Sequence, residues 1–162
     1  MKAAVRICFV CAGNICRSPT AEGVMRRMVE ARGLADRIRI ESAGTGSWHV
    51  GDRADSRSRK AAEARGYTLD RRAQQFTRRF FERFDYVLVA DSNNHDHLVQ
   101  LATDGAARSK IHLLRDFDPA SPKGSDVPDP YYGGPEGFEL VLDICEASCR
   151  ALLEHLVLEL GP

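Results

Sequence analysis

The chain lacks any apolar run that approaches the roughly 20 residues needed to span a bilayer. Its N-terminal apolar stretch is interrupted by Arg6 and runs into Asn14 and Arg17, which makes it a poor signal peptide. Net charge is also absent, because 23 Lys and Arg residues balance 23 Asp and Glu residues. Charge therefore predicts neither a nucleic-acid nor a membrane partner. No internal repeat or linker divides the sequence, so we expect one domain over residues 1–162.

The chain has only five cysteines, which is an odd number, and none of them lies between Cys16 and Cys145. An odd number of thiols suits a reducing cytosol better than a disulfide scaffold. We therefore expect a cytoplasmic protein, with export by a signal-independent route left open. Cys8, Cys145 and Cys149 lie among apolar residues, and we expect them in the core.

Apolar patterns predict alternating strands and helices. Strands are expected at 3–10, 37–42, 85–90 and 110–114, and helices at 19–32, 56–65, 77–82, 92–102 and 136–159. This alternation predicts an α/β sandwich around a parallel sheet. Ligands of such sheets bind beyond the carboxyl ends of the strands. Four segments should meet there: the loop after residue 10, the turn at 42–48, the segment at Asp91 and the long loop 117–134.

The loop that contains Cys11 and Arg17 joins the first strand to the first helix. Ser18 is the expected N-cap of that helix and Pro19 its first residue. Backbone N–H groups and the helix dipole favour an anion there, and Gly13 allows a close approach. The same setting favours the thiolate form of Cys11, and the planar fork of Arg17 matches phosphate oxygens. The loop therefore indicates phosphoryl transfer through sulfur.

The sequence gives less support to other roles for these thiols. Cys8 and Cys11 form a C-x-x-C pair, but residues three apart on a strand face opposite sides, which disfavours a dithiol. Zinc held by Cys8, Cys11 and Cys16 lacks a completing ligand. A nucleotide loop would need a Gly-Lys-Ser/Thr ending that is missing. A purely structural buried thiol at Cys11 stays open.

The run Cys-Ala-Gly-Asn-Ile-Cys-Arg-Ser-Pro from Cys11 to Pro19 resembles the signature of the low-molecular-weight protein tyrosine phosphatases. Further pieces resemble this family at matching distances: Ser42-Ala43-Gly44-Thr45, Trp48, Asp91 with Asn94, and Asp129-Pro130-Tyr131-Tyr132. The resemblance implies a four-stranded parallel sheet of order 2-1-3-4, flanked by helices on both faces. It implies neither a cofactor nor a metal.

The resemblance also assigns roles. Cys11 would be the nucleophile, Arg17 the phosphate clamp and Asp129 the general acid and base. Charge and spacing alone do not separate Asp129 from the other aspartates of its loop, Asp116, Asp118 and Asp126. Substrate would contact the loop and an aromatic wall, with residues Ala12, Gly13, Asn14, Ile15, Cys16, Ser18, Trp48, Tyr131 and Tyr132.

Some residues have two candidate roles. Ser18 could cap the helix or donate to the Cys11 thiolate, and Asp91 could cap the next helix or support the site together with Ser42. In relatives with the same cysteine pair, Cys16 forms a protective disulfide with the nucleophile, and we expect the same here. The family often has His at the position of Arg71 and Arg-Gln at Gln74-Gln75, so contacts made there are open.

We therefore expect a phosphatase that hydrolyses phosphotyrosine and aryl phosphates, acts on phosphotyrosine proteins and is a monomer or weak homodimer. One rival is a thiol-coupled arsenate reductase, which needs two relay cysteines in a mid-chain segment where this sequence has none. The other rival is a non-catalytic phosphoprotein-binding module, which would need no general acid.

Overall fold

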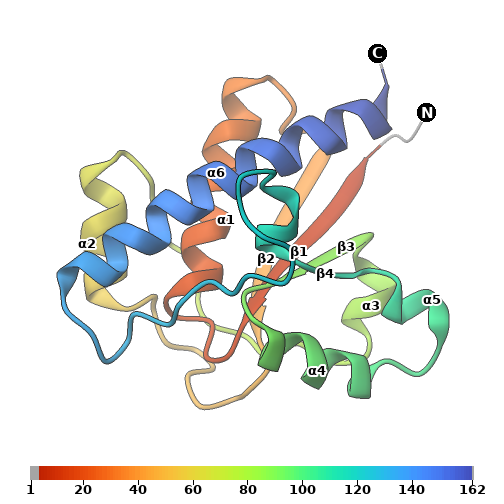
Figure 1. Ribbon diagram of the computed structural model, residues 1–162, viewed down its shortest axis with the longest axis horizontal. Coiled ribbons are helices and arrows are strands. Elements are labelled where there is room, and N and C mark those ends of the chain that lie inside the picture. Colours follow the sequence, from red (N-terminus) through yellow and green to blue (C-terminus); the bar gives the residue numbers. More distant parts are fainter. Residues whose placement is uncertain (1–3, 162) are drawn as a thin grey trace.

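The computed structural model describes residues 4–161, and its centre is a parallel sheet (Figure 1). The strands are β1 (Val5–Cys11), β2 (Ile38–Gly44), β3 (Tyr86–Val89) and β4 (Ile111–Leu113). They pair in the order β2-β1-β3-β4, and every pairing is parallel. The expected order is confirmed. Ala3, the expected first residue of β1, lies outside the described residues.

Helices cover both faces of the sheet, as Figure 1 shows. The helices α1 (Arg17–Ala31), α2 (Ser56–Ala64) and α6 (Pro135–Leu160) lie on one side. The other side carries α3 (Phe80–Arg83), α4 (Ser92–Leu101) and α5 (Gly105–Arg108). A 3-10 turn, η1 (Leu114–Phe117), follows β4. The architecture is therefore the expected three-layer α/β sandwich.

Alternation along β1 divides the core in two. Val5, Ile7, Phe9 and Cys11 belong to the cluster that α1 and α6 cover. Cys8 and Val10 belong to the opposite cluster, which α3 and α4 cover. Cys8 and Cys11 therefore lie on different faces of the sheet, as the spacing predicts, and do not form a dithiol site.

The carboxyl ends of the strands carry the functional loops. β1 leads into residues 12–16, β2 into residues 45–55 and β3 into Asp91 at the start of α4. The long loop returns to this edge, where Val127 donates its N–H to the carbonyl of Ala90 at 2.7 Å. Arg115 secures the same loop by donating to the carbonyl of Asp126 at 2.8 Å.

Three expectations need correction. α1 begins at Arg17, with Cys16 as its N-cap, so Ser18 does not cap it. β2 continues to Gly44, because Ala43 and Gly44 pair with β1 instead of forming a turn. α5 and η1 were not expected, since four-residue elements are too short to produce a periodic pattern. No helix within residues 4–161 has the length and apolar content to cross a membrane.

Candidate active site

The loop from Cys11 to Arg17 forms a cradle whose carbonyl groups point outward. The carbonyl of Cys11 accepts a hydrogen bond from the N–H of Thr45 at 2.8 Å, and that of Ala12 accepts from Gly46 at 3.0 Å. The carbonyl of Ile15 accepts from Asp55 at 2.8 Å. Outward carbonyls leave the loop N–H groups for an anion beside the start of α1.

Asn14 holds the loop in this shape. It has a φ of 58°, the one positive value of a non-glycine residue within 4–161. Its amide donates to the hydroxyls of Ser18 at 2.8 Å and Ser42 at 3.0 Å, and its carbonyl oxygen accepts from the backbone of Gln74 at 3.0 Å. These bonds offset the cost of a left-handed backbone, which asparagine tolerates better than most residues. The Asn14 side chain lies behind the cradle, outside the set of residues that line the cavity.

The side chain of Ser18 contacts the Cys11 thiol instead of capping α1. Its hydroxyl lies 3.0 Å from the sulfur of Cys11, and its backbone N–H donates to the same sulfur at 3.4 Å. Because Ser18 lies inside the first turn of α1, its side chain is directed back towards β1. Of the two roles considered for Ser18, the structure therefore supports the bond to Cys11.

Arg17 lies buried beside the thiol and is held by three oxygens. Its Nη1 donates to Asp91 Oδ2 at 2.6 Å and to the carbonyl of Val127 at 3.0 Å. Its Nη2 lies 3.7 Å from Asp129 Oδ2. Burial opposes the charge of Arg17, but the negative charges of Cys11 and Asp91 outweigh it and raise the pKa of Arg17. The guanidinium is therefore a fixed positive charge with a fixed orientation.

Asp91 contacts both Arg17 and the start of α4. One carboxylate oxygen holds Arg17, and the other accepts the N–H of Asn94 at 2.8 Å. Asn94 in turn accepts the N–H of Asp91 at 3.2 Å, which completes a capping box at the start of α4. The N-terminus of α4 thus positions the carboxylate that orients Arg17.

The two thiols of the loop differ in environment. Cys16 is 5% exposed, and burial raises its pKa to about 12 although Ser58 donates a hydrogen bond to it. Cys16 is therefore a neutral thiol near pH 7. Around the sulfur of Cys11 lie instead the Ser18 hydroxyl, the start of α1 and the Arg17 guanidinium.

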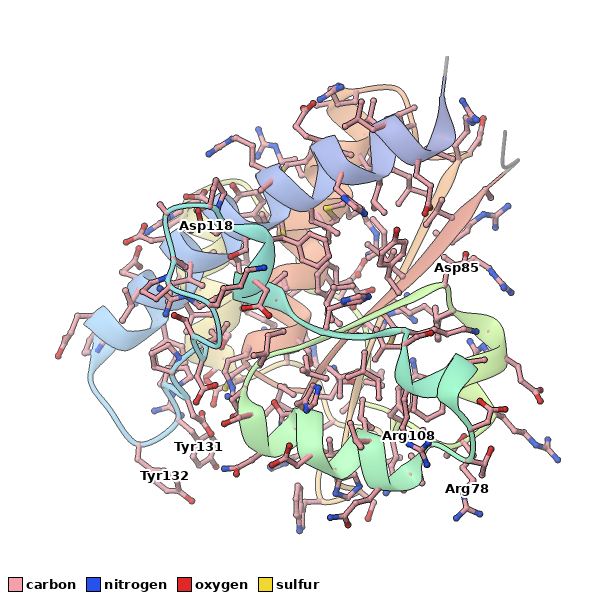
Figure 2. All side chains as sticks on the ribbon, turned by 45° about the vertical axis from the view of Figure 1, so that its right-hand side comes forward. Arg78, Asp85, Arg108, Asp118, Tyr131 and Tyr132 are labelled. Atoms are coloured by element: carbon pink, nitrogen blue, oxygen red, sulfur yellow. The ribbon has the colours of Figure 1, made fainter. Side chains whose placement is uncertain are left out.

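A cavity of about 360 Å³ opens above this loop. The residues that line it are Cys11, Ala12, Gly13, Ile15, Cys16, Arg17, Trp48, His49, Asp129, Tyr131 and Tyr132. Three aromatic residues form its rim, where Trp48 is 72% and Tyr132 94% exposed. Figure 2 shows Tyr131 and Tyr132 together on the loop before α6, and their rings pack edge-to-face at 4.9 Å. The cavity therefore offers an aromatic slot above a thiol and a guanidinium.

The structure separates the four aspartates of the long loop. Asp129 lines the cavity, and its Oδ1 accepts the N–H of Tyr131 at 3.1 Å. Asp118 lies at the other end of the loop, well away from Tyr131 in Figure 2, where it accepts the N–H of Ala120. Asp116 accepts the N–H of Gly124, and Asp126 that of Ser92. Asp129 alone of these four lines the cavity.

Two residues of the site were not predicted from the sequence. His49 lines the cavity, where a Cβ at Gly13 would meet its ring at 3.0 Å, and its Nδ1 lies 3.1 Å from Asp52. The position of His49 next to Trp48 was the available signal. Glu22 is 2% exposed and accepts a bond from the Ser42 hydroxyl at 2.6 Å. A lone glutamate on a predicted helix gave no reason to expect it inside.

Glu22 connects the loop to two arginines. Arg71 donates to it at 2.6 Å and Arg26 at 2.7 Å, so its buried charge is paired twice. The contact of Arg71 that was left open thus runs through Glu22 and Ser42 to Asn14. The side chain of Gln74 donates to the carbonyl of Ser42 at 3.0 Å. Ser42 thus bonds Asn14, Glu22 and Gln74 behind the loop.

Among residues 4–161, no group of three or more His, Cys, Asp or Glu side chains is placed to hold a metal ion.

The chain resembles known proteins over almost its whole length. Residues 6–160 match the model of the family described as low molecular weight phosphotyrosine protein phosphatase. A low molecular weight protein-tyrosine-phosphatase of Streptomyces coelicolor is 48% identical over 149 residues, which cover 91% of each chain. A low molecular weight phosphotyrosine protein phosphatase of Rattus norvegicus is 39% identical, over 91% of this chain and 93% of its own.

Solved structures are also similar to this chain over almost its whole length. The protein tyrosine phosphatase of Entamoeba histolytica superimposes with a TM-score of 0.90 at 39% identity, over 94% of this chain and 97% of its own. YfkJ of Bacillus subtilis superimposes with a TM-score of 0.88 at 33% identity, over 96% of both chains.

Proposed function

Because the chain belongs to the low-molecular-weight protein tyrosine phosphatase family, we propose that it hydrolyses phosphotyrosine through a cysteinyl-phosphate on Cys11. One observation carries the proposal: a single cavity has the Cys11 thiol and the Arg17 guanidinium at its floor and the Asp129 carboxyl at its rim. Nucleophile, charge clamp and proton donor are the three groups that phosphoryl transfer through sulfur requires.

In the first step, the thiolate sulfur of Cys11 attacks phosphorus in line. The sulfur–phosphorus bond forms while the bond from phosphorus to the tyrosine oxygen breaks. Asp129 gives its proton to the leaving oxygen, which would otherwise depart as an unfavourable tyrosinate. Arg17 and the loop N–H groups hold the equatorial oxygens, so electrostatic stabilisation and positioning carry most of the catalysis.

In the second step, the Asp129 carboxylate takes a proton from water. The water oxygen attacks phosphorus, and the sulfur–phosphorus bond breaks to give inorganic phosphate and the Cys11 thiolate. The Ser18 hydroxyl, 3.0 Å from the sulfur, is placed to donate to this thiolate and make it a better leaving group. Asp129 regains its proton and the cycle is complete.

The rim supports a preference for aryl phosphates. Trp48, Tyr131 and Tyr132 present aromatic surface at the height where the phenyl ring of a bound phosphotyrosine would lie. Trp48 itself rests on Gly46, where a Cβ would displace the indole ring. Phosphotyrosine proteins are therefore the proposed substrates.

Arsenate reduction fits the thiols less well than hydrolysis. A relay needs a second thiol that can reach Cys11 and then be released to the solvent. Cys145 and Cys149 are fully buried on α6, and burial raises the pKa of Cys145 to about 12. A non-catalytic binding module would not need a proton donor such as Asp129 at the rim of the cavity.

We also propose that Cys16 protects Cys11 from oxidation. Peroxide would convert the Cys11 thiolate to a sulfenic acid with loss of hydroxide, and Cys16 would then form a disulfide with release of water. Peroxide-treated protein should lose activity and recover it fully with dithiothreitol, whereas Cys16→Ser should lose activity irreversibly. Equal recovery of the two proteins would contradict this role.

All five cysteines are free and buried, which fits a reducing compartment such as the cytoplasm.

Hydrolysis of p-nitrophenyl phosphate with excess chelator tests the proposed function. Freshly reduced wild-type protein should turn over this substrate, and Cys11→Ser should not, although its melting temperature should stay close to that of the wild type. Absence of turnover by the wild type, or equal turnover by the variant, would contradict the proposal. Arsenate reduction with a thiol donor would then be measured.

A further inference from the structure

A second cavity, of about 370 Å³, lies between α2 and the N-terminal end of α6, which are neighbours in Figure 1. Its surface is mainly apolar and comes from both helices and the glycine-rich segment before α6. The lining residues are Arg57, Lys60, Ala61, Ala64, Gly133, Gly134, Pro135, Phe138 and Glu139. We call this cavity the α2/α6 groove. Its open, apolar character is that of a surface that receives a side chain.

The α2/α6 groove continues from the active-site cavity. Arg57 forms the boundary: its guanidinium carbon lies 5.3 Å from the ring of Tyr131 and 4.8 Å from the ring of Phe138. Tyr131 lines the active-site cavity and Phe138 lines the groove. The two hollows are thus separated by one guanidinium, which contacts a ring that belongs to each of them.

Arg57 is held in this position. It donates from Nε to Asp55 Oδ1 at 3.0 Å and from Nη2 to Asp55 Oδ2 at 2.9 Å. Asp55 caps α2 and donates its own N–H to the carbonyl of Ile15 in the catalytic loop. The bonds from Arg57 lower the pKa of Asp55, so the pair is ionised near neutral pH. The groove is therefore fixed in relation to the Cys11 cavity.

Charged side chains of both signs lie at the edge of the groove. Lys60 is exposed at this edge, and the one acidic lining residue, Glu139, is paired with Arg65 at 2.8 Å. Arg65 also bonds Asp143 at 2.9 Å. Arg65 bonds Glu146 at 2.9 Å as well, so three carboxylates share this one guanidinium, and the selectivity of the groove rests on its apolar surface.

We propose that the α2/α6 groove is a substrate subsite that receives an apolar side chain of the phosphoprotein, from a residue close in sequence to the phosphotyrosine. The inference rests on the proposed function, because the phosphotyrosine in the Cys11 cavity sets where the flanking chain lies. An apolar side chain would bury itself against Ala64 and Phe138, which line the groove. The groove would thereby select among phosphotyrosine proteins.

Synthetic phosphotyrosine peptides test this subsite. In a Gly/Ser host, one leucine is moved through the four positions on each side of the phosphotyrosine, and kcat/KM is measured for each peptide. One position should exceed the all-Gly/Ser host by roughly tenfold, as expected for burial of one aliphatic side chain. Activity on p-nitrophenyl phosphate is measured in parallel, because it reports the proposed function without using the groove.

The variant Ala64→Gln fills the groove with a polar side chain and leaves the net charge unchanged. It should abolish the leucine preference through KM and leave p-nitrophenyl phosphate hydrolysis at the wild-type rate. Ala106→Gln, on the exposed surface of α5 at the other end of the molecule in Figure 1, is the matched control and should retain the preference. A flat leucine scan, or a preference that survives Ala64→Gln, would overturn the subsite while turnover of p-nitrophenyl phosphate upheld the phosphatase.

Discussion

Arg17 Nη1 and Asp91 Oδ2 lie 2.6 Å apart, and this contact joins the Cys11–Arg17 loop to the start of α4. The two residues are 74 positions apart in the sequence and come from loops that follow neighbouring strands, β1 and β3. Asp91 therefore fixes the direction of the guanidinium before substrate arrives, and preorganisation of this kind costs no rearrangement during the reaction.

Asp91→Asn should lower kcat by about tenfold to a hundredfold, less than the ~10²–10³ lost with a direct transition-state donor. The substitution removes the charge that orients Arg17, while asparagine can still cap α4. Steady-state kinetics on p-nitrophenyl phosphate measures the effect. Asn94→Ala is the control, because it breaks the capping box without touching Arg17. It should lower the melting temperature and keep most of the activity, and a larger loss of kcat there than in Asp91→Asn would contradict the role of Asp91.

Asp129→Asn should lower kcat by roughly 10²–10⁴ on phosphotyrosine, because the leaving oxygen would receive no proton. The loss should be smaller for aryl phosphates whose phenols are more acidic, since those leave without help. A series of substituted phenyl phosphates measures this dependence on the leaving group. Asp118→Asn, in the same loop but outside the cavity, should have wild-type kinetics. A loss that is equal for all leaving groups would show that Asp129 is not the acid.

Iodoacetate at pH 7 should alkylate Cys11 and spare Cys16. Burial raises the pKa of Cys16 to about 12, so its reactive thiolate is populated only as the pH approaches that value. Peptide mapping by mass spectrometry identifies the labelled thiol, and inorganic phosphate should slow the labelling. Labelling of Cys16 at a comparable rate at pH 7 would contradict the difference between the two thiols.

Asn14 contributes both a backbone conformation and three hydrogen bonds, and two substitutions separate them. Asn14→Gly keeps access to positive φ and loses the side-chain bonds, whereas Asn14→Ala loses both. The alanine variant should therefore be less stable than the glycine variant by about 1 kcal/mol, measured by urea unfolding. Both should lose activity, because Ser18 and Ser42 lose their common partner. Equal stability of the two variants would show that the backbone conformation at Asn14 is not strained.

Much of the fold was predictable because its signals are local. The apolar segments and their alternation located the four strands, and the spacing of Cys8 and Cys11 placed them on opposite faces. The end of α2 was predictable for the same reason, since Gly66 has the positive φ of 89° that stops a helix. The strand order itself came from the family resemblance.

The site was less predictable where tertiary contacts override local preference. Ser18 has the sequence context of an N-cap, but its hydroxyl contacts the Cys11 sulfur at 3.0 Å instead of capping α1. Glu22 is buried because Arg26 and Arg71 reach it from separate segments, which no local pattern indicates. Gly44 reads as a turn residue, yet it is a strand residue on which a Cβ would lie 2.7 Å from the carbonyl oxygen of Ala12.

Trapping of the phosphoenzyme tests the central claim most directly. Wild-type protein and Cys11→Ser are mixed with a phosphotyrosine peptide, quenched within one turnover, and examined by intact-mass and peptide mass spectrometry. The account predicts one phosphoryl group on Cys11 in the wild type, discharged as inorganic phosphate on further incubation, and none in the variant. Turnover of the peptide with no phosphoryl group on Cys11, or with the group on another residue, would contradict it.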